Sequence, residues 1–548
     1  MTLDGFLTFL TLLVAIYALV PPVARLSAKL GMGIQLPLAI GALLLVLYLE
    51  FFDGLGQPCP ALLGRTCGWL IFPADSSVTP QRAAFLVVLI WSLAAWTIHR
   101  WYRPGAGSLP ALSRLVDGLA SEQRFSEVLK LLEAHLPMIG RAGRRNLPLQ
   151  RLHDGLRAMS GGNVGLLLYL SRYDRDKIEL AARRSPFVKR LRRWFGSLAV
   201  IIPAQRAAET AAEDIARVLF QSAELRQFIA QMRPYFAISL LRLDLHGMQN
   251  FSSAYFRELI SSPGSVLYEE LRQNQTQAFP GGYEFPESNR LLHFLFSDVS
   301  TAEKLGVWKP IGDHLARILR SDRHQDYVEF LNGRADYFDD ECWQDPIFVG
   351  MHFFDLMVSA AAYQGVRWHM WLYYFPIIMQ KLVNNYDTSN SNIDTSVEFP
   401  TRGARLIYEA IDVLGEWVKL GAELPETSPH RQIPSQFTID NGNIPVSAAV
   451  SLGRCMRTIA MSKQIGDTFA GRMHEVIMLR ISLLPLDGSE GQMRKFLIQS
   501  LIQGGRLDAD RVYGDRLGTY FCMADDLLQH EFGDYRDAVR KAYPGAIP

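Results

Sequence analysis

Apolar residues are distributed unevenly along the chain. Three long apolar stretches, at residues 3–23, 34–52 and 83–99, fall within the first hundred residues, and no stretch of comparable length and hydrophobicity follows them. Each approaches the roughly 20 residues that an α-helix needs to cross the hydrocarbon core of a bilayer. The pattern predicts a mainly α protein in which a three-helix transmembrane anchor precedes a large, predominantly helical body.

Basic residues beside the apolar stretches predict the orientation of this anchor. None precedes the first stretch, and Arg100, Arg103 and Arg114 follow the third, whereas the long loop at 53–82 contains only two. Short cytoplasmic flanks of membrane spans are enriched in Lys and Arg. We therefore expect a multi-pass protein of the plasma (inner) membrane, with its amino terminus and the 53–82 loop outside and its body in the cytoplasm. The alternative is a buried hydrophobic hairpin in a protein without spans.

The cysteines are compatible with this orientation. Cys59 and Cys67 lie in the predicted outer loop, where an oxidising environment favours a disulfide between them; two unpaired thiols are the alternative. Cys342, Cys455 and Cys522 are scattered through the body without the spacing of a metal site. The sequence therefore predicts no metal centre, and it identifies no cofactor.

The body shows the periodicity of amphipathic helices. Apolar residues recur every three or four positions, and the longest such stripe predicts a single surface helix that ends at Pro234. Leu241, Leu243 and Leu245 alternate with polar residues and suggest a short strand, and Asn441 with Gly442 suggests a hairpin. The predicted helical segments are 112–119, 207–229, 303–319, 402–420, 445–461, 469–483 and 508–528.

Polar, turn-rich stretches begin at Phe279, Asn384 and Glu423 and predict loops. A domain seam is expected at the first or the third of them. Together with the charge distribution, this divides the chain into an anchor at 1–104, a basic helical juxtamembrane region at 105–280 and a helical carboxyl-terminal region with acidic and aromatic segments at 281–548.

Residues 141–193 contain fourteen basic side chains against four acidic ones, a net charge of +10 in a chain whose total is +1. Its end is a basic amphipathic segment near the third apolar stretch, a pattern typical of binding to anionic lipid. A phosphate-bearing ligand or pairing with acidic residues would use the same arginines. The candidate anion- or lipid-binding residues are Arg183, Arg184, Lys189, Arg190, Arg192 and Arg193.

An acidic segment at 331–400 has nine acidic and three basic residues and is a candidate partner for the basic one. Within it, residues 346–383 are strongly apolar, but internal charges disfavour membrane insertion, so we predict two buried core helices there. His352 and Asp355 share one helical face and His369 lies in the adjoining segment. These three are the candidate catalytic residues, and buried structural side chains are the alternative.

The common signatures of nucleotide-binding, hydrolase and zinc-ribbon proteins are missing from the sequence. We therefore expect a membrane-anchored, non-enzymatic sensor, scaffold or effector, such as a bacterial defence or secretion component, whose body couples a ligand or partner to the membrane. Expected partners are membrane lipid, anionic lipid in particular, and a second copy or another protein, with nucleic acid or a nucleotide less favoured. The alternative is a membrane-tethered enzyme that acts on a phosphorylated or lipid-like substrate.

Overall fold

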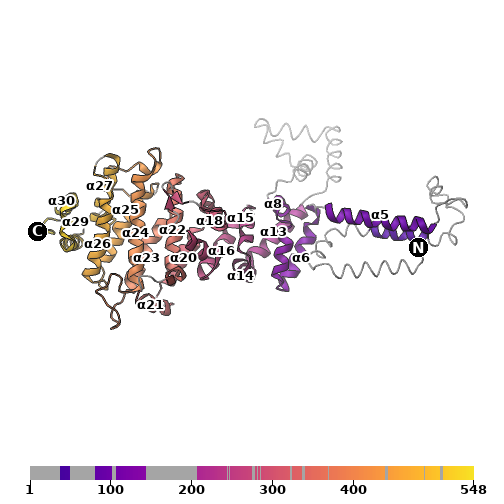
Figure 1. Cartoon of the computed structure of the whole chain (residues 1–548), viewed down its shortest axis with the longest axis horizontal. Coiled ribbons are helices and arrows are strands. Elements are labelled where there is room, and N and C mark those ends of the chain that lie inside the picture. Colours follow the sequence, from indigo (N-terminus) through magenta and orange to yellow (C-terminus); the bar gives the residue numbers. More distant parts are fainter. Residues whose placement is uncertain are drawn as a thin grey trace, which may run out of the picture. The chain divides into compact units, whose positions relative to one another are not determined.

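The computed structural model describes residues 37–49, 80–101, 106–143 and 206–548, the last range with gaps at 244, 246, 275–277, 280–281, 284, 321–323, 336–339, 368–369, 439–441, 487 and 507–509. This part of the chain is mainly α-helical, as the sequence pattern predicts (Figure 1). Contacts between residues divide the chain into two units, Met1–Leu225 with Ser239–Gly247, and Arg226–Ile238 with Met248–Pro548. The predicted domain seams beginning at Phe279 and Glu423 both lie within the second unit.

The first unit has a small apolar core. Leu112 and Val116 of helix α6 and Ile215 and Leu219 of helix α13 are fully buried, and α13 packs against α6 and α8. The predicted helix at 112–119 is thereby confirmed. The described elements up to the second unit are the helix Pro37–Leu49, α5 (Pro80–Trp101), η2 (Ala106–Ser108), α6 (Leu109–Ser121), α7 (Phe125–Glu133), α8 (Leu136–Gly143), α13 (Arg206–Gln221), α14 (Ala223–Met232) and α15 (Pro234–Leu241), the last two of which contribute residues to both units.

The second and third apolar stretches of the sequence form two helices that pack against each other. Val46 and Leu49 of the helix Pro37–Leu49 are buried with Ala84 and Val88 of α5. We call this pair the apolar hairpin. Its outward side chains are exposed and are Leu38, Ile40, Leu43, Leu44, Phe85, Leu86, Leu89, Ile90 and Leu93. The first stretch, at 3–23, lies outside the described residues, so the three-helix anchor stays a prediction.

One described helix, α22 (Pro346–Tyr363), has the length and hydropathy to cross a bilayer, but 72% of it is buried inside the protein. The apolar helices Pro37–Leu49 and Arg82–Ala95 are shorter. Because its side chains pack against other helices, α22 belongs to the core of the second unit. Together with the buried face of α23 (Tyr374–Asn385), this confirms the two core helices predicted at 346–383.

The second unit is a helical assembly with one minimal hairpin. The two strands pair antiparallel, with Ala278 opposite Tyr283 and Phe279 opposite Gly282. Its other elements are α16 (Met248–Ser261), α17 (Val266–Gln273), β1 (Ala278–Phe279), β2 (Gly282–Tyr283), α18 (Arg290–Phe296), α19 (Val299–Leu305), α20 (Trp308–Ile318), α21 (Gln325–Leu331), η3 (Asp340–Gln344), η4 (Met370–Tyr373), α24 (Arg402–Glu423), η5 (Pro429–Arg431), α25 (Ile444–Ala460), α26 (Asp467–Ser482), α27 (Gly488–Gln503), α28 (Arg511–Met523), α29 (Asp526–Glu531) and α30 (Gly533–Ala542).

Helix α25 lies at the centre of this assembly and is buried along nearly its whole length. It contacts α23, α24 and α27, and Figure 1 shows α24, α25 and α26 side by side. Gly453 brings α25 so close to α27 that a β-carbon at this position would overlap the backbone carbonyl oxygen of Ser500. Glycine is therefore required here for helix packing, not for backbone conformation.

Two predicted single helices are each divided in two by local signals. The stripe at 207–229 breaks at Ser222, whose hydroxyl accepts a hydrogen bond from the backbone N–H of Leu225 at 3.2 Å and so satisfies a free donor of the next helix. Pro234 then begins α15 at its first turn, where proline is tolerated. The segment 303–319 breaks at Gly306, which has a left-handed φ of 62° and ends α19.

The predicted helix at 508–528 is also wrong as a single element. It is two helices, α28 and α29, because Asp525 adopts an extended ψ of 140° and caps the N–H of Leu527. The predicted strand at 241–245 is not present in the described residues there, since Leu241 ends α15 and Leu243 lies in a turn. The only strands in the described part are instead β1 and β2, which flank the start of the stretch from Phe279 that the sequence pattern assigned to a loop. The predicted Asn441–Gly442 hairpin falls mostly outside the described residues.

A buried ion pair attaches α30 to α27. Arg494 is 5% exposed and donates to both carboxylate oxygens of Asp534, at 2.7 Å from Nε and 3.0 Å from Nη2. Its Nη1 also donates to the carbonyl oxygens of Ile481 and Leu484. Burial alone would raise the pKa of Asp534, but its bonds to Arg494 lower it overall. The guanidinium thus satisfies four acceptors from three parts of the unit.

Replacing Gly453 and Gly118 by alanine should change stability in opposite directions. Gly453→Ala forces α25 and α27 apart and should cost about 2 kcal/mol or more. Gly118 lies in α6, where an added methyl group would have nothing within 4 Å, so Gly118→Ala should stabilise by up to about 1 kcal/mol. Thermal unfolding followed by circular dichroism would measure both; equal midpoints for the two variants would contradict the packing argument.

Arg494→Met should destabilise the second unit by about 2 kcal/mol, because the partly buried carboxylate of Asp534 and the Leu484 carbonyl lose the bonds from Arg494, while the Ile481 carbonyl keeps the N–H of Leu484. Arg511→Met is the matched control. The Arg511 and Asp515 side chains are 57% and 50% exposed, and such pairs contribute about 0–1 kcal/mol. The midpoint of urea unfolding should fall clearly for the first variant and hardly for the second.

Candidate functional site

The candidate catalytic residues do not form an acid–base pair in the described structure. His352 lies on α22 with its ring at 5.1 Å from the Trp343 ring, edge to face, and its buried Nε2 has no hydrogen-bond partner among the described residues. Burial lowers the pKa of His352 to about 4, so the ring is neutral at pH 7. His369 lies outside the described residues.

Asp355 has structural partners of its own. The indole N–H of Trp417 on α24 donates to its Oδ1 at 2.9 Å, and the Ser359 hydroxyl lies at 3.5 Å from the same oxygen. The bond from Trp417 connects α22 to α24 within the core. The described hydrogen bonds of Asp355 thus go to Trp417 and Ser359, and His352 packs against Trp343; a catalytic role for His352, Asp355 and His369 stays a prediction.

The remaining site candidates of the sequence lie outside the described residues. They are Arg183, Arg184, Lys189, Arg190, Arg192 and Arg193 of the basic segment, and the candidate disulfide residues Cys59 and Cys67. Within the described residues, no group of His, Cys, Asp or Glu side chains has the arrangement of a metal site. The lipid-binding and disulfide assignments stay predictions.

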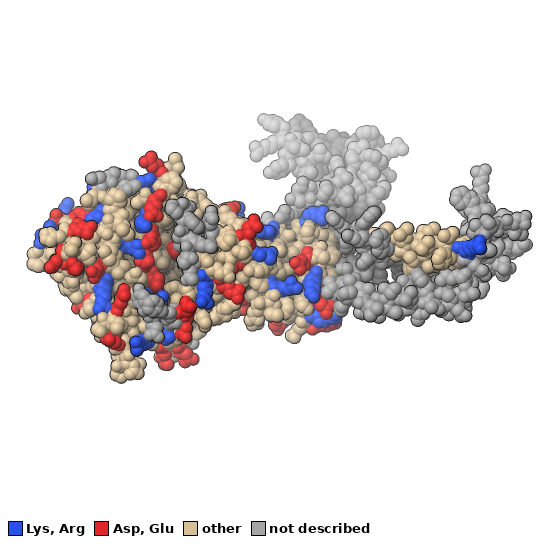
Figure 2. All heavy atoms as spheres, viewed as in Figure 1, with Lys and Arg blue, Asp and Glu red and all other residues tan. Residues whose placement is uncertain are grey.

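The described part of the acidic segment is engaged within the second unit. Asp340 pairs with Arg272 at 3.3 Å, and Glu341 pairs with Arg402 at 3.4 Å. Acidic and basic side chains are interspersed over the face of the second unit that Figure 2 shows. Docking of the basic segment onto this region would therefore compete with pairs that already exist.

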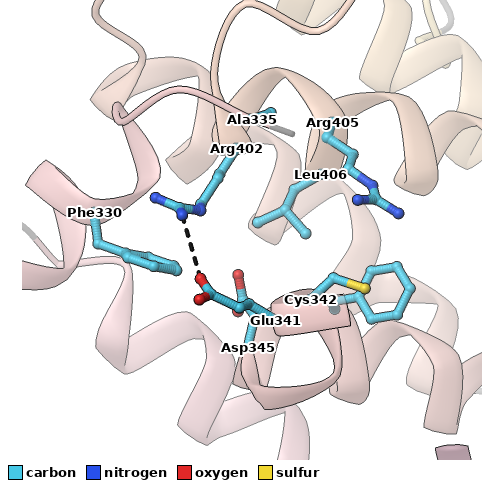
Figure 3. Close-up of a pocket in the computed structure, with 9 residues that line it drawn as sticks. Phe330, Ala335, Glu341, Cys342, Asp345, Arg402, Arg405 and Leu406 are labelled. Carbon is cyan, nitrogen blue, oxygen red and sulfur yellow. Dashed lines mark hydrogen bonds and ion pairs between the residues drawn. The ribbon is translucent and has the colours of Figure 1, made fainter. Parts of the chain in front are cut away.

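A pocket opens between the start of α24 and the turn that precedes α22 (Figure 3). Its cavity volume is about 20 Å³, room for about one water molecule. Arg402 and Arg405 enter it from the first turn of α24, which Thr401 caps through a hydrogen bond from the N–H of Ala404 to its hydroxyl. The lining residues are Phe330, Ala335, Glu341, Cys342, Asp345, Phe348, Arg402, Arg405 and Leu406.

Both guanidinium groups lie over aromatic rings. The Arg402 guanidinium is 4.3 Å from the centre of the Phe330 ring, and that of Arg405 is 5.8 Å from the centre of the Phe348 ring. Such cation–π contacts hold the planar guanidinium groups in place. The N–H donors lie in the plane of each group and so do not point at the rings. Arg405 also lies 3.7 Å from Glu409, whose pKa burial raises to about 6 although the charge of Arg405 lowers it.

Asp345 at the base of the pocket is a structural acid. It is 6% exposed, caps α22 by accepting the N–H of Ile347 at 2.7 Å, and accepts the hydroxyl of Tyr327 at 2.6 Å. Burial raises the pKa of Asp345, and its hydrogen bonds partly offset this shift. Its Oδ1 atom therefore already accepts hydrogen bonds from the start of α22 and from Tyr327.

The sequence pattern missed this pocket because its residues come from four separate segments. It did predict the helix that begins at Arg402, and the spacing of Arg402 and Arg405 places both on one face of its first turn. Without the tertiary fold, two arginines at a helix start are indistinguishable from a solvated surface. The same holds for Phe330, which would otherwise be an ordinary exposed aromatic residue.

Buried neutral histidines should make the protein acid-sensitive. Burial lowers the pKa values of His314, His352 and His474 to about 4 each, below the ordinary value of 6.5. Below pH 6.5 these histidines gain a proton in the unfolded state but not in the folded one, so protonation favours unfolding. The free energy of unfolding should therefore fall by about 2 kcal/mol per histidine between pH 7 and pH 5. His352→Leu should reduce this acid loss, measured as the difference in unfolding free energy between the two pH values. The same change at exposed His530 is the control, and an equal reduction there would refute the assignment.

Known proteins offer no template for this pocket. The chain matches no family model, no curated protein and no solved structure at a significant level. The functional assignment therefore rests on the chain's own geometry and sequence.

Proposed function

We propose that this chain is a membrane-anchored, non-enzymatic sensor, scaffold or effector, in which the helical body couples a ligand or partner to the membrane. One observation carries the proposal: the apolar hairpin has a small buried seam and a broad exposed apolar surface. Phe85, Leu89 and Leu93 recur every four residues along α5 and are 56%, 54% and 62% exposed. Apolar surface of this extent is a feature of sites that meet lipid or another protein.

The dimensions of α5 favour lipid. Its 22 residues correspond to about 33 Å of helix, close to the roughly 30 Å of a hydrocarbon core; the apolar part, Arg82–Ala95, is shorter, so the flanking residues of the helix would complete the span. In the sequence, Arg82 and Arg100 are near the two ends of this helix, positions that suit basic residues beside a headgroup layer. Figure 2 shows the described part of the apolar hairpin with almost no charged side chains, in contrast to the second unit. We propose that the stretch at 3–23 adds a third span.

The proposed orientation has the amino terminus outside and the body in the cytoplasm, in agreement with the distribution of basic residues. The basic segment at 141–193 would then face the cytoplasmic leaflet, where each basic residue near anionic lipid contributes about 1 kcal/mol. Three spans per chain enclose no channel, so a membrane-disrupting effector would need several copies. A defence or secretion component of a bacterial envelope fits this organisation.

The membrane assignment predicts how the full chain fractionates. It should stay in the membrane pellet after carbonate washing and enter solution only with detergent. In unbroken cells, an external protease should leave the carboxyl-terminal body intact. Recovery of the full chain in a detergent-free supernatant would disprove the anchor, and digestion of the body would reverse the orientation.

An arginine introduced into the outward face of α5 should impair membrane retention. Leu89→Arg places a charge near the middle of the proposed span, which costs about 2.5–3.5 kcal/mol on insertion scales. Leu527→Arg is the matched control, since Leu527 is an even more exposed leucine (77%) in the second unit. The fraction of protein in the washed pellet should fall for the first variant and stay constant for the second.

A further inference from the structure

The end of α26 carries an exposed apolar stripe. Leu479, Leu483 and Leu486 are 47%, 51% and 64% exposed. The first two are four residues apart and therefore share one face at the end of the helix, and Leu486 follows in the turn that leaves it. We call these three residues the leucine stripe. Single exposed leucines are common on protein surfaces, whereas several in a row at helical spacing mark a site of association.

The leucine stripe has a rigid support. Met478, Ile481 and Leu484, which alternate with its residues along the chain, are at most 2% exposed and face the core. The turn after α26 is fixed as well, since α27 approaches it so closely that a β-carbon at Gly491 would overlap the carbonyl oxygen of Leu486. A partner that covers the stripe would therefore order few groups that are not already ordered.

The solvent face of α24 borders the stripe with an ionic row. Arg480 of α26 bonds to Asp412 and Glu416 of α24 and so holds the two helices together. Further along α24, Lys419 lies 3.8 Å from Glu416 and 2.8 Å from Glu423. The carboxylates are the more exposed groups, because Glu416 and Glu423 are each 43% exposed and Arg480 is 19% exposed. Figure 2 shows this row of mainly acidic side chains over α24.

Two further acids lie close to the stripe in the chain. Glu475 precedes Leu479 by one turn of α26, and Glu426 follows the end of α24. Neither has an ion-pair partner within the described part of the chain. Residues 412–426 and 472–486 together contain five acids and three bases, a net charge of 3 − 5 = −2. The apolar stripe thus has an acidic rim.

This charge selects among the possible occupants of the stripe. An anionic lipid surface would be repelled by the rim, and a second copy would bring a like-charged rim against it. A helix with an apolar face for the stripe and Lys or Arg along both edges of that face would be attracted. Such a helix reads the same spacing of three and four residues that the leucines follow.

We propose that the leucine stripe and its acidic rim bind a basic amphipathic helix of a protein partner. The stripe supplies the apolar contact, and the rim fixes the orientation of the bound helix through its basic edges. The inference deepens the proposed function, on which it rests only for the consequence of binding at the membrane. It names the kind of partner that the body would sense.

The probe is a fluorescein-labelled peptide of Leu and Lys, about four helical turns long, with Leu at helical spacing. It is titrated with the full chain in micelles of an uncharged detergent, and fluorescence anisotropy gives an apparent Kd. One comparison peptide has Glu in place of every Lys, and a second has the same composition without the helical spacing. Micelles without protein give the background from partitioning into detergent.

Variants of the stripe and of the rim should both weaken binding. Leu479→Ala combined with Leu483→Ala should raise the apparent Kd about tenfold. Glu475→Lys should raise it about threefold, because it reverses an unpaired charge on the rim. Leu527→Ala and Glu531→Lys, the same kinds of change at exposed residues of α29, should leave it unchanged. Circular dichroism verifies that each variant is folded.

Saturable binding of the Leu and Lys peptide that the stripe and rim variants weaken, and the α29 variants do not, would support the proposal. Absence of saturable binding, equal binding of either comparison peptide, or equal Kd values in all variants, as expected if lipid or detergent covers the stripe, would each overturn it. Light scattering on the same samples tests a second copy as the occupant. A dimer that the double alanine variant abolishes would also overturn the proposal.

The membrane proposal is tested separately by fractionation. Peptide binding by a chain that is not retained in membranes would leave this docking surface valid and remove the proposed function. Retention in membranes without peptide binding would do the reverse.

Discussion

The architecture of the second unit depends on the close approach of α25 and α27 at Gly453. A side chain there would separate the two backbones, and α25 is buried against α23 and α24 as well, so the displacement would pass to every neighbouring helix. Dense packing of this kind converts the loss of one contact into a shift of a whole helix. On the other side of α24, the aromatic contact of Phe375 with Trp417 at 4.8 Å and the bond of Trp417 to Asp355 connect α24 to α23 and α22.

Most buried acids of this unit serve helix ends and ion pairs. Glu270 of α17 is 2% exposed and accepts the N–H groups of Leu291 and Leu292 at the start of α18, while Asp345 does the same for its own helix α22. These carboxylates remove free backbone donors that would otherwise be buried without partners. Glu270 and Asp345 thus have structural roles, and burial is the cause of the raised pKa of each. Glu341 differs because its carboxylate is exposed and faces an arginine on an open pocket.

Apolar side chains are placed differently in the apolar hairpin and in the second unit. In the apolar hairpin, large apolar side chains are exposed on both sides of a small buried cluster of Val46, Leu49, Ala84 and Val88. In the second unit, apolar side chains point inward, and the buried Arg494 donates to the carboxylate of Asp534 and to two carbonyl oxygens. A single chain with both patterns suits a protein that shares its surface between lipid and water, which is the physical basis of the proposed function.

The sequence alone determined the mainly helical character, the position of the apolar hairpin and helices such as α24 and α25, because these follow from local spacing of apolar residues and from caps such as Thr401. It missed the breaks at Ser222 and Asp525, since the apolar period continues through them. The bond of Asp355 to Trp417, 62 positions away, and the meeting of Arg402 with Glu341, 61 positions away, were decided only by the tertiary structure. Contacts between distant segments depend on how whole helices pack, and no local pattern of residues encodes that arrangement.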